Sequence, residues 1–231
     1  MAERDRADLL VEAWALVAER GWQGWGPVAL ARRTGRSLVE IYALFPDRRA
    51  LVTALGHRLD AAMLDVPLAE LEGMSVRERL FELTMRRFEA MRPFRDGLRA
   101  AGRAVWADPA LACGTIGNLD RMADWLLAAS EAELRGLAAR LGRRALQLAY
   151  LRSFAVFLED DTADLSRTMA ELDRRLGELD TAARFFGLGR AAEEPGRRPG
   201  EGEEGTREIG KHTSELQSHV NIVCRLLLEK K

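Results

Sequence analysis

Lysine is missing from the first 190 residues, because all three lysines lie at positions 211, 230 and 231. Apart from His57, every basic side chain before position 191 is therefore an arginine. This change in composition indicates a domain boundary near Arg190. The formal net charge of −1 argues against a protein coated in positive charge for nonspecific binding of nucleic acid, but it leaves room for a local basic patch.

Cysteine is equally scarce, and long hydrophobic runs are missing. The chain has two cysteines, Cys113 and Cys224, whose separation matches no metal-ligand spacing. Because no hydrophobic signal segment opens the sequence, we expect a reduced, cytoplasmic protein. No uninterrupted apolar stretch approaches the roughly 20 residues needed to cross a bilayer, so we expect no transmembrane segment.

Alternating runs of valine, isoleucine, threonine and tyrosine are also missing, whereas alanine, leucine, arginine and glutamate dominate. These four are strong helix formers, so the sequence predicts an all-α fold. Its 231 residues, 47% of them apolar, are enough for a small head and a larger body. We expect a head at 1–64, a helical body at 65–190, a disordered linker at 191–206 and a C-terminal amphipathic helix at 207–231.

Glycine, proline and capping residues divide the head into helices. Gly21 is expected to end the first helix, and Pro27 to begin a second that Gly35 closes. Ser37 can cap a third helix running to Phe45. Asp47 can cap a fourth, whose inner side is expected to carry Leu51, Leu55, Leu59 and Met63. Two short helices joined by a tight glycine-containing turn and braced by a preceding helix make a helix-turn-helix.

Over residues 8–55 the head resembles the TetR family of transcriptional regulators. The segments that carry the resemblance are AERG at 18–21, LARRTGRS at 30–37 and IYALFPDRRAL at 41–51. The resemblance implies a DNA-binding head and a helical body that binds an apolar small ligand. It also implies a homodimer formed through the last two body helices, near Arg140–Glu159 and Leu165–Leu179. The candidate DNA-binding residues are Arg36, Ser37, Leu38, Glu40, Tyr42, Arg48 and Arg49.

The expected recognition helix departs from the family pattern. Residues 37–45 contain no cation and one acid, Glu40, and Val39 and Glu40 stand where the family usually has glycine or proline and then threonine. A carboxylate near DNA phosphates opposes binding unless it accepts from a cytosine amine. The flanking arginines either hold phosphates or are ordinary solvated surface. The sequence therefore leaves two hypotheses open, a DNA-binding head and a head that has lost this activity.

The body opens with a capping box, Ser75 to Glu78, at the start of a helix that ends near Pro93. Further helices are expected over 94–106, 109–130, 132–159 and 165–186. Methionine and aromatic residues on these helices usually pack in the core, but they also line apolar ligand pockets. The candidate ligand-binding residues are Phe81, Met85, Phe88, Trp125, Tyr150 and Phe154.

A second resemblance covers residues 150–176, including FLEDDTADL at 157–165. This stretch is similar to the lipid-binding accessory protein family of ubiquinone biosynthesis. That resemblance implies a TetR-like fold without DNA binding that presents lipid-like precursors to membrane enzymes. A lipid-binding accessory function is therefore the alternative to a regulator.

No nucleophile with a neighbouring base, phosphate-binding glycine loop or metal-ligand spacing stands out, so we expect neither an enzyme nor a cofactor. The acids at 159–164 are expected to cap the helix that follows them rather than hold a cation. In the C-terminal segment, apolar residues 209, 216, 220, 223 and 227 form a short seam. That helix is expected to fold back on the body, to pair with a partner helix, or to lie on a membrane surface.

Overall fold

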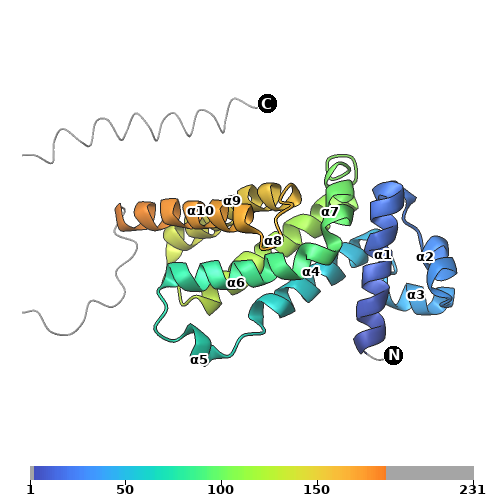
Figure 1. Ribbon diagram of the computed structural model, residues 1–231, viewed down its shortest axis with the longest axis horizontal. Helices are drawn as coiled ribbons and strands as arrows, with labels where there is room; N and C mark the ends of the chain where they lie inside the picture. Colours follow the sequence, from blue (N-terminus) through green and yellow to red (C-terminus); the bar gives the residue numbers. More distant parts are fainter. Residues whose placement is uncertain (1–2, 186–231) are drawn as a thin grey trace, which may run out of the picture. The chain divides into compact units, whose positions relative to one another are not determined.

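The computed structural model describes residues 3–185, and within that range every regular element is helical (Figure 1). The all-α prediction is confirmed. The linker expected at 191–206 and the helix expected at 207–231 lie outside the described residues. The helices are α1 (Glu3–Gly24), α2 (Pro27–Thr34), α3 (Leu38–Leu44), α4 (Arg48–Leu64), α5 (Leu68–Leu71), α6 (Val76–Met91), the 3-10 turn η1 (Arg92–Phe94), α7 (Arg95–Gly102), α8 (Pro109–Ala129), α9 (Gly136–Leu158) and α10 (Ser166–Phe185).

The boundaries of α2 and the break at Gly21 confirm the sequence prediction. Pro27 occupies the first turn of α2, and Gly35 closes it in the left-handed conformation, with φ of 68°. Gly21 also has non-helical backbone angles, with a positive φ of 74°, so the first helical run of α1 ends there and a second, short run continues across a kink to Gly24. A side chain at Gly21 or Gly35 would strain the backbone, so both turns depend on glycine.

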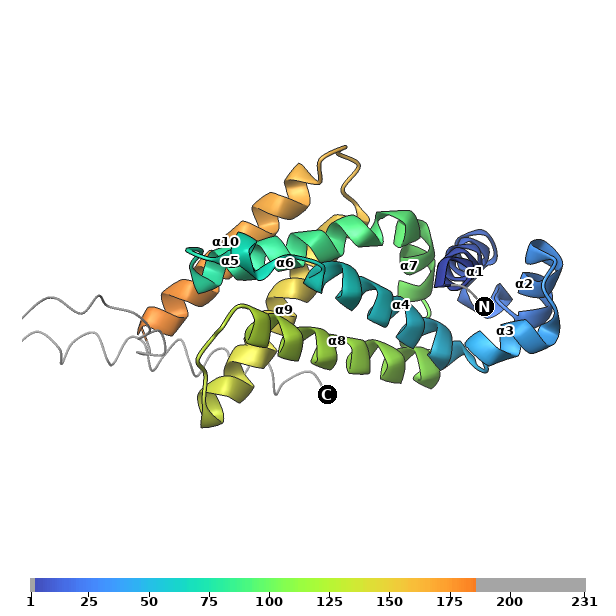
Figure 2. The same ribbon diagram turned by 90° about the horizontal axis from the view of Figure 1, so that it is seen from below.

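The helix α4 belongs to the head and to the body at once. Its inner face is buried through Leu51, Leu55, Leu59 and Met63, as the sequence predicted. This face packs against α6 and α8, while α1 lies along α7 and α9 packs on α10. Figure 2 shows α4 running between the α2–α3 pair at one end and the body helices at the other. Residues 3–185 consequently lie within one compact unit.

Two helices of the body are shorter than the sequence indicates. Helix α7 ends at Gly102 instead of near 106, and α9 begins at Gly136 instead of at 132. Glu131 and Gly136 both have positive φ, 56° and 58°, which breaks the helical path before α9. The capping box of Ser75 and Glu78 at the start of α6 is confirmed. No helix in the described range is long and apolar enough to cross a membrane.

The acids between α9 and α10 cap the next helix, as expected. The Asp160 carboxylate accepts hydrogen bonds from the backbone and hydroxyl of Thr162 and of Thr168, at 2.5 to 3.1 Å. Burial alone would raise the pKa of Asp160, but these hydrogen bonds lower it to about 2. Asp164 accepts from the Ser166 N–H at 3.1 Å. Within residues 3–185 no group of acids, histidines and cysteines is arranged to hold a metal ion.

Candidate functional site

The helix α3 has one face anchored in the head and one face exposed. Ile41 is fully buried and Phe45 is 3% exposed, so these two side chains fix α3 against the head core. On the opposite face Leu38, Val39 and Tyr42 are 53%, 78% and 69% exposed. This outer face carries no cation, and its aliphatic part offers apolar contact of the kind that suits a thymine methyl group.

Glu40 has a structural role at the start of α3 that the sequence analysis missed. Its carboxylate accepts from the Ser37 N–H and hydroxyl, both at 2.9 Å, while the Ser37 oxygen accepts from the Glu40 N–H at 3.3 Å. It also lies 3.2 Å from the Arg36 guanidinium. The hydrogen bond from the Ser37 N–H is the main cause that lowers the pKa of Glu40. The Ser-x-x-Glu spacing, the same as at Ser75 and Glu78, was the available signal.

Two of the flanking arginines hold the head together. Arg33 donates to Glu12 at 2.5 Å and to Glu19 at 2.7 Å, and the hydrogen bond with Glu19 is the main cause that raises its pKa. Arg48 donates to the Gln23 side chain at 2.7 Å and to the Gln23 carbonyl at 3.1 Å. Arg48 was expected to touch phosphate, and the structure places its guanidinium against the end of α1.

Other arginines of the head remain on the surface. Arg49, also a candidate DNA-binding residue, is exposed on the first turn of α4, and Arg32 is exposed on α2. Neither has an ion pair in the part of the chain that the structure describes. Of the three candidate arginines, Arg49 is therefore exposed, Arg36 is paired with Glu40, and Arg48 makes internal contacts.

Asp108 links the head to the first turn of α8. Its carboxylate accepts from the Trp22 indole N–H at 2.7 Å, which is the main cause that lowers its pKa. It also accepts from the Ala110 N–H at 2.9 Å and so caps α8. The Arg48 guanidinium lies 3.6 Å from the same carboxylate. The hydrogen bond between Trp22 and Asp108 joins residues 86 positions apart, and no local sequence pattern indicates it.

Three of the candidate ligand-binding residues lie together in an aromatic cluster of α6 and α9. The ring of Phe88 stacks on Tyr150 and Phe157 with centroids 5.3 and 5.4 Å apart, and Tyr150 stacks on Phe154 at 6.3 Å. Phe81 is partly buried and Met85 is 8% exposed, and both belong to the same apolar core. Trp125 differs from the others, because it is 51% exposed on α8.

A buried ionic network connects the aromatic cluster to α4. Arg87 of α6 is 3% exposed, pairs with Asp60 of α4 and donates to the Tyr150 hydroxyl at 3.2 Å. Arg121 of α8 donates to the second Asp60 oxygen at 2.6 Å. Burial is the main cause that raises the pKa of Tyr150. One ionic network therefore joins α4, α6, α8 and α9 next to the candidate ligand residues, an arrangement that sequence spacing could not reveal.

The outer face of α9 carries an exposed apolar seam. Its members follow one another in steps of four and three residues, the spacing of a coiled-coil contact. The leucines at 137, 141, 148 and 151 are 71%, 59%, 60% and 39% exposed. The seam consists of Leu137, Leu141, Arg144, Leu148, Leu151 and Ala155.

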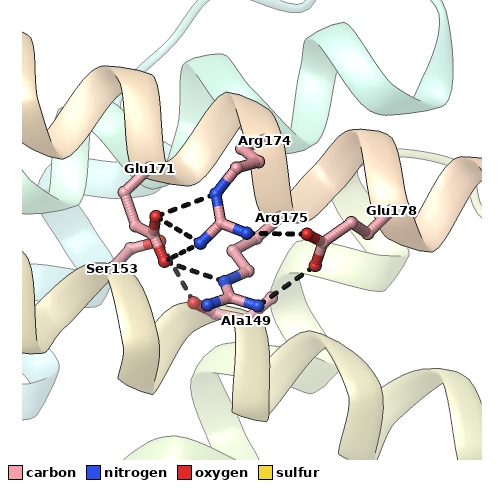
Figure 3. A network of polar contacts seen from close by, with 6 residues as sticks. All are labelled: Ala149, Ser153, Glu171, Arg174, Arg175 and Glu178. Carbon is pink, nitrogen blue, oxygen red and sulfur yellow. Dashed lines mark hydrogen bonds and ion pairs between the residues drawn. The ribbon is translucent and has the colours of Figure 1, made fainter.

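The neighbouring surface of α10 is ionic instead. Arg174 and Arg175 both pair with Glu171 and Glu178, at distances of 2.7 to 3.1 Å. Figure 3 shows this network on α10 beside Ala149 and Ser153 of α9. Because the opposite charges lie on the same helix, α10 satisfies its own ions, and the α9 seam is the apolar part of this side.

No protein-family model matches the sequence, and no curated protein matches it. Solved structures do resemble it. A TetR transcriptional regulator from Nitrosomonas europaea shares 21% identity, with a TM-score of 0.65 over 78% of this chain and 99% of that one. A TetR-family regulator from Streptomyces coelicolor shares 16%, with a TM-score of 0.58 over 82% and 87%. One from Rhodococcus sp. RHA1 shares 19%, with a TM-score of 0.51 over 78% and 97%. At these identities the likeness concerns architecture, and the chain has the fold of TetR-family transcriptional regulators.

Proposed function

We propose that the protein is a TetR-type transcriptional regulator that binds DNA through its helix-turn-helix. The observation that carries this proposal is the geometry of α3. Its first turn is fixed by a capping box and its inner face by Ile41 and Phe45, so its outer face is held in one orientation towards solvent. A short exposed helix held in this way is what a major groove accepts.

In this proposal phosphate contacts provide most of the affinity. Arg36 and Arg49 flank α3 and bind phosphates of the DNA backbone, whereas Arg48 positions the end of α1 against α4. The Tyr42 hydroxyl and the apolar Leu38 face the major groove, whereas the Ser37 hydroxyl is engaged in the capping box with Glu40. Such an interface favours sites where thymine methyl groups meet the apolar part of α3.

The proposed effector is an apolar small ligand that enters the aromatic cluster of the body. Separating Phe88 from Tyr150 would move the Tyr150 hydroxyl, to which Arg87 donates at 3.2 Å. Arg87 also pairs with Asp60 on α4, the helix that continues into the head. A ligand that prefers the separated arrangement would therefore shift the position of α4.

The proposed active form is a homodimer that uses α9 together with α10. The α9 seam supplies four exposed leucines at coiled-coil spacing, and the ions of α10 border it. Two copies of the seam packed together would bury these side chains, and a twofold pair of heads then reads two half-sites.

The decisive experiment is a salt titration of binding to the DNA upstream of the protein's own gene, with native lipid mass spectrometry on the same preparation. A regulator protects a specific DNA site in a footprinting experiment, and its affinity for that site falls as the salt concentration rises. Replacing Arg36 and Arg49 by glutamine should make the plot of log affinity against log salt concentration less steep by about two units, near one for each lost phosphate contact. The same change at Arg103 and Arg167, exposed arginines outside α3 and α9, is the control.

The lipid-binding accessory function is the alternative that this experiment separates. The observation in its favour is the outer face of α3, which exposes Leu38 and Val39 and carries no cation. An accessory protein would carry copurified lipid and show no specific footprint at any salt concentration. That combination would overturn the regulator proposal.

A further inference from the structure

An open groove lies along the outer face of α4, away from the aromatic cluster. It is bounded by the first half of α1, by the turn from α3 to α4 and by α4 itself, and its volume is about 840 Å³. Small-molecule sites span about 300 to 1,000 Å³, so this α4 groove has the size of a ligand site.

The walls of the α4 groove are apolar. Leu10 of α1 and Phe45 of the α3–α4 turn line one side, and Ala50, Ala54 and Ala61 line the α4 side. The alanines lie on one face at steps of four and seven residues, so much of the α4 wall is made of methyl groups, with the Thr53 and His57 side chains beside them. A slender aliphatic chain fits such a wall better than a bulky ring system.

The charge in the α4 groove is positive. Arg6, Arg49 and Arg58 line it, against the single carboxylate of Asp47. Three arginines less one aspartate leave two positive charges with His57 neutral. The Asp47 carboxylate is already engaged in capping α4, because it accepts from the Ala50 N–H at 2.7 Å.

The three groove arginines have no ion pair with a carboxylate within residues 6–185. Arg58 is nevertheless held in place, since it donates to the Ala7 carbonyl at 3.2 Å and its guanidinium lies 5.4 Å from the Phe94 ring centre. By contrast, Arg33 and Arg48 on the same head are paired with acids. An anion entering the α4 groove therefore meets an excess of positive charge, because Asp47 offsets only one of the three arginines.

We propose that the α4 groove binds a long-chain carboxylate, with its aliphatic chain against Leu10, Phe45 and Ala54 and its carboxylate paired with the groove arginines. This site is separate from the body cluster assigned above to an apolar effector. Because Arg49 is also a proposed phosphate contact, an occupant would compete with DNA. That consequence rests on the proposed function, whereas the binding itself does not.

The test is isothermal titration of the full chain, without DNA, with dodecanoate below its micelle concentration. Dodecyltrimethylammonium, which has the same chain and the opposite charge, is the matched probe. Dodecanoate should bind and the ammonium should not. Replacing Arg6 and Arg49 by glutamine should weaken binding at least tenfold, as expected for lost charge-assisted hydrogen bonds. The control replaces two exposed arginines outside the groove, Arg32 and Arg140, by glutamine, and it should leave the affinity for dodecanoate unchanged.

A second variant, Ala54→Phe, fills the middle of the α4 groove and should abolish binding, while Phe154→Ala in the body cluster should not affect it. If Ala54→Phe does not fold, as judged by circular dichroism, the pair at Arg6 and Arg49 decides alone, since both are exposed. No heat of binding, equal binding of both amphiphiles, or a loss caused by Phe154→Ala but not by the arginine pair would each overturn the proposal. None of these results depends on whether the head binds DNA.

Discussion

At the start of α3, one carboxylate has two opposing effects. Glu40 satisfies the Ser37 N–H and so stabilises the first turn of the helix that would enter DNA. The same charge would face phosphates and draws Arg36 towards itself at 3.2 Å. The sequence alone indicated that Glu40 opposes DNA binding unless it accepts from a cytosine amine. In the structure its removal would also release the first turn of α3. The two effects can be separated because glutamine also completes a capping box.

We predict that Glu40→Gln strengthens DNA binding several-fold while the thermal midpoint changes little. The amide oxygen still accepts from Ser37, and the negative charge that opposes the DNA phosphates is gone. Glu40→Thr removes the reciprocal bond and should lower the midpoint. Fluorescence anisotropy at two salt concentrations and thermal melts measure both effects. Weaker binding by Glu40→Gln, with α3 still folded, would mean that the carboxylate contacts a cytosine amine.

We predict that Asp160→Asn lowers the free energy of unfolding at neutral pH by about 2 kcal/mol. This is the free energy that corresponds to a carboxyl pKa of about 2 in the folded protein and 3.8 in the unfolded chain. Because the pKa of Asp160 is lower in the folded protein than in the unfolded chain, its ionised carboxylate contributes its full stabilisation above about pH 4. That stabilisation is lost as the pH falls through about 2. Asparagine loses the two acceptor bonds from Thr168. Urea unfolding at pH 7 and pH 3 measures the difference. Asp161→Asn, at the exposed neighbour, is the control, and an effect that does not shrink at pH 3 would contradict this assignment.

At the scale of the helix, α9 and α10 were both expected to form the dimer, but their exposed faces differ. Amphipathic spacing predicted both helices because their buried faces are similarly apolar. Which outer face stays apolar depends on the partners that the surface residues find. On α10 the ions pair with one another, whereas the leucines of the α9 seam have no cover within residues 3–185. We therefore expect the dimer interface to be formed mainly by the α9 seam.

We predict that Leu148→Glu converts the homodimer to a monomer, because it places a charge in the centre of the α9 seam. Arg144→Leu should have the opposite effect and tighten the dimer, since it completes the apolar repeat at the cost of a surface ion pair with Asp120. Sedimentation equilibrium of both variants measures the change. Leu68→Glu, at a leucine 78% exposed on α5, is the control. An unchanged mass for Leu148→Glu would exclude α9 from the interface.

For the whole molecule, the sequence predicted the helices well because their signals are local. Pro27, Gly35, Ser37 and Asp47 each act within one turn, and the structure has all four in the expected roles. The break of the helical path at Gly21 was also expected, whereas the short helical run that follows it to Gly24 was not.

The candidate site was harder to predict, because its chemistry depends on contacts between distant residues. Asp60, Arg87, Arg121 and Tyr150 come from four helices, and their spacing in the sequence carries no pattern. Trp125 illustrates the same limit, since an aromatic residue on an amphipathic helix was expected inside and is 51% exposed. Local signals define the helices, whereas tertiary packing decides which side chains meet.

The last prediction concerns the coupling of head and body through α4. Arg87 lies in the body, yet its ion pair holds Asp60 on the helix shared with the head. Replacing Arg87 by methionine leaves the buried Asp60 with Arg121 as its remaining arginine partner, which should cost about 3 kcal/mol. If α4 unites the two parts, this body variant also destabilises the head.

Trp14, Trp22 and Trp25 are buried in the head, so fluorescence reports on the head when the exposed body tryptophans Trp106 and Trp125 are replaced by phenylalanine in every variant. Far-ultraviolet circular dichroism reports on all the helices. In urea both signals should shift to the same lower midpoint for Arg87→Met, in a single transition. Arg86→Met, at the neighbouring arginine with exposed partners Glu70 and Glu82, should cost no more than about 1 kcal/mol. A fluorescence midpoint that stays at the wild-type value while the circular dichroism midpoint falls would show that the head unfolds independently, and α4 would then not transmit a signal from the body.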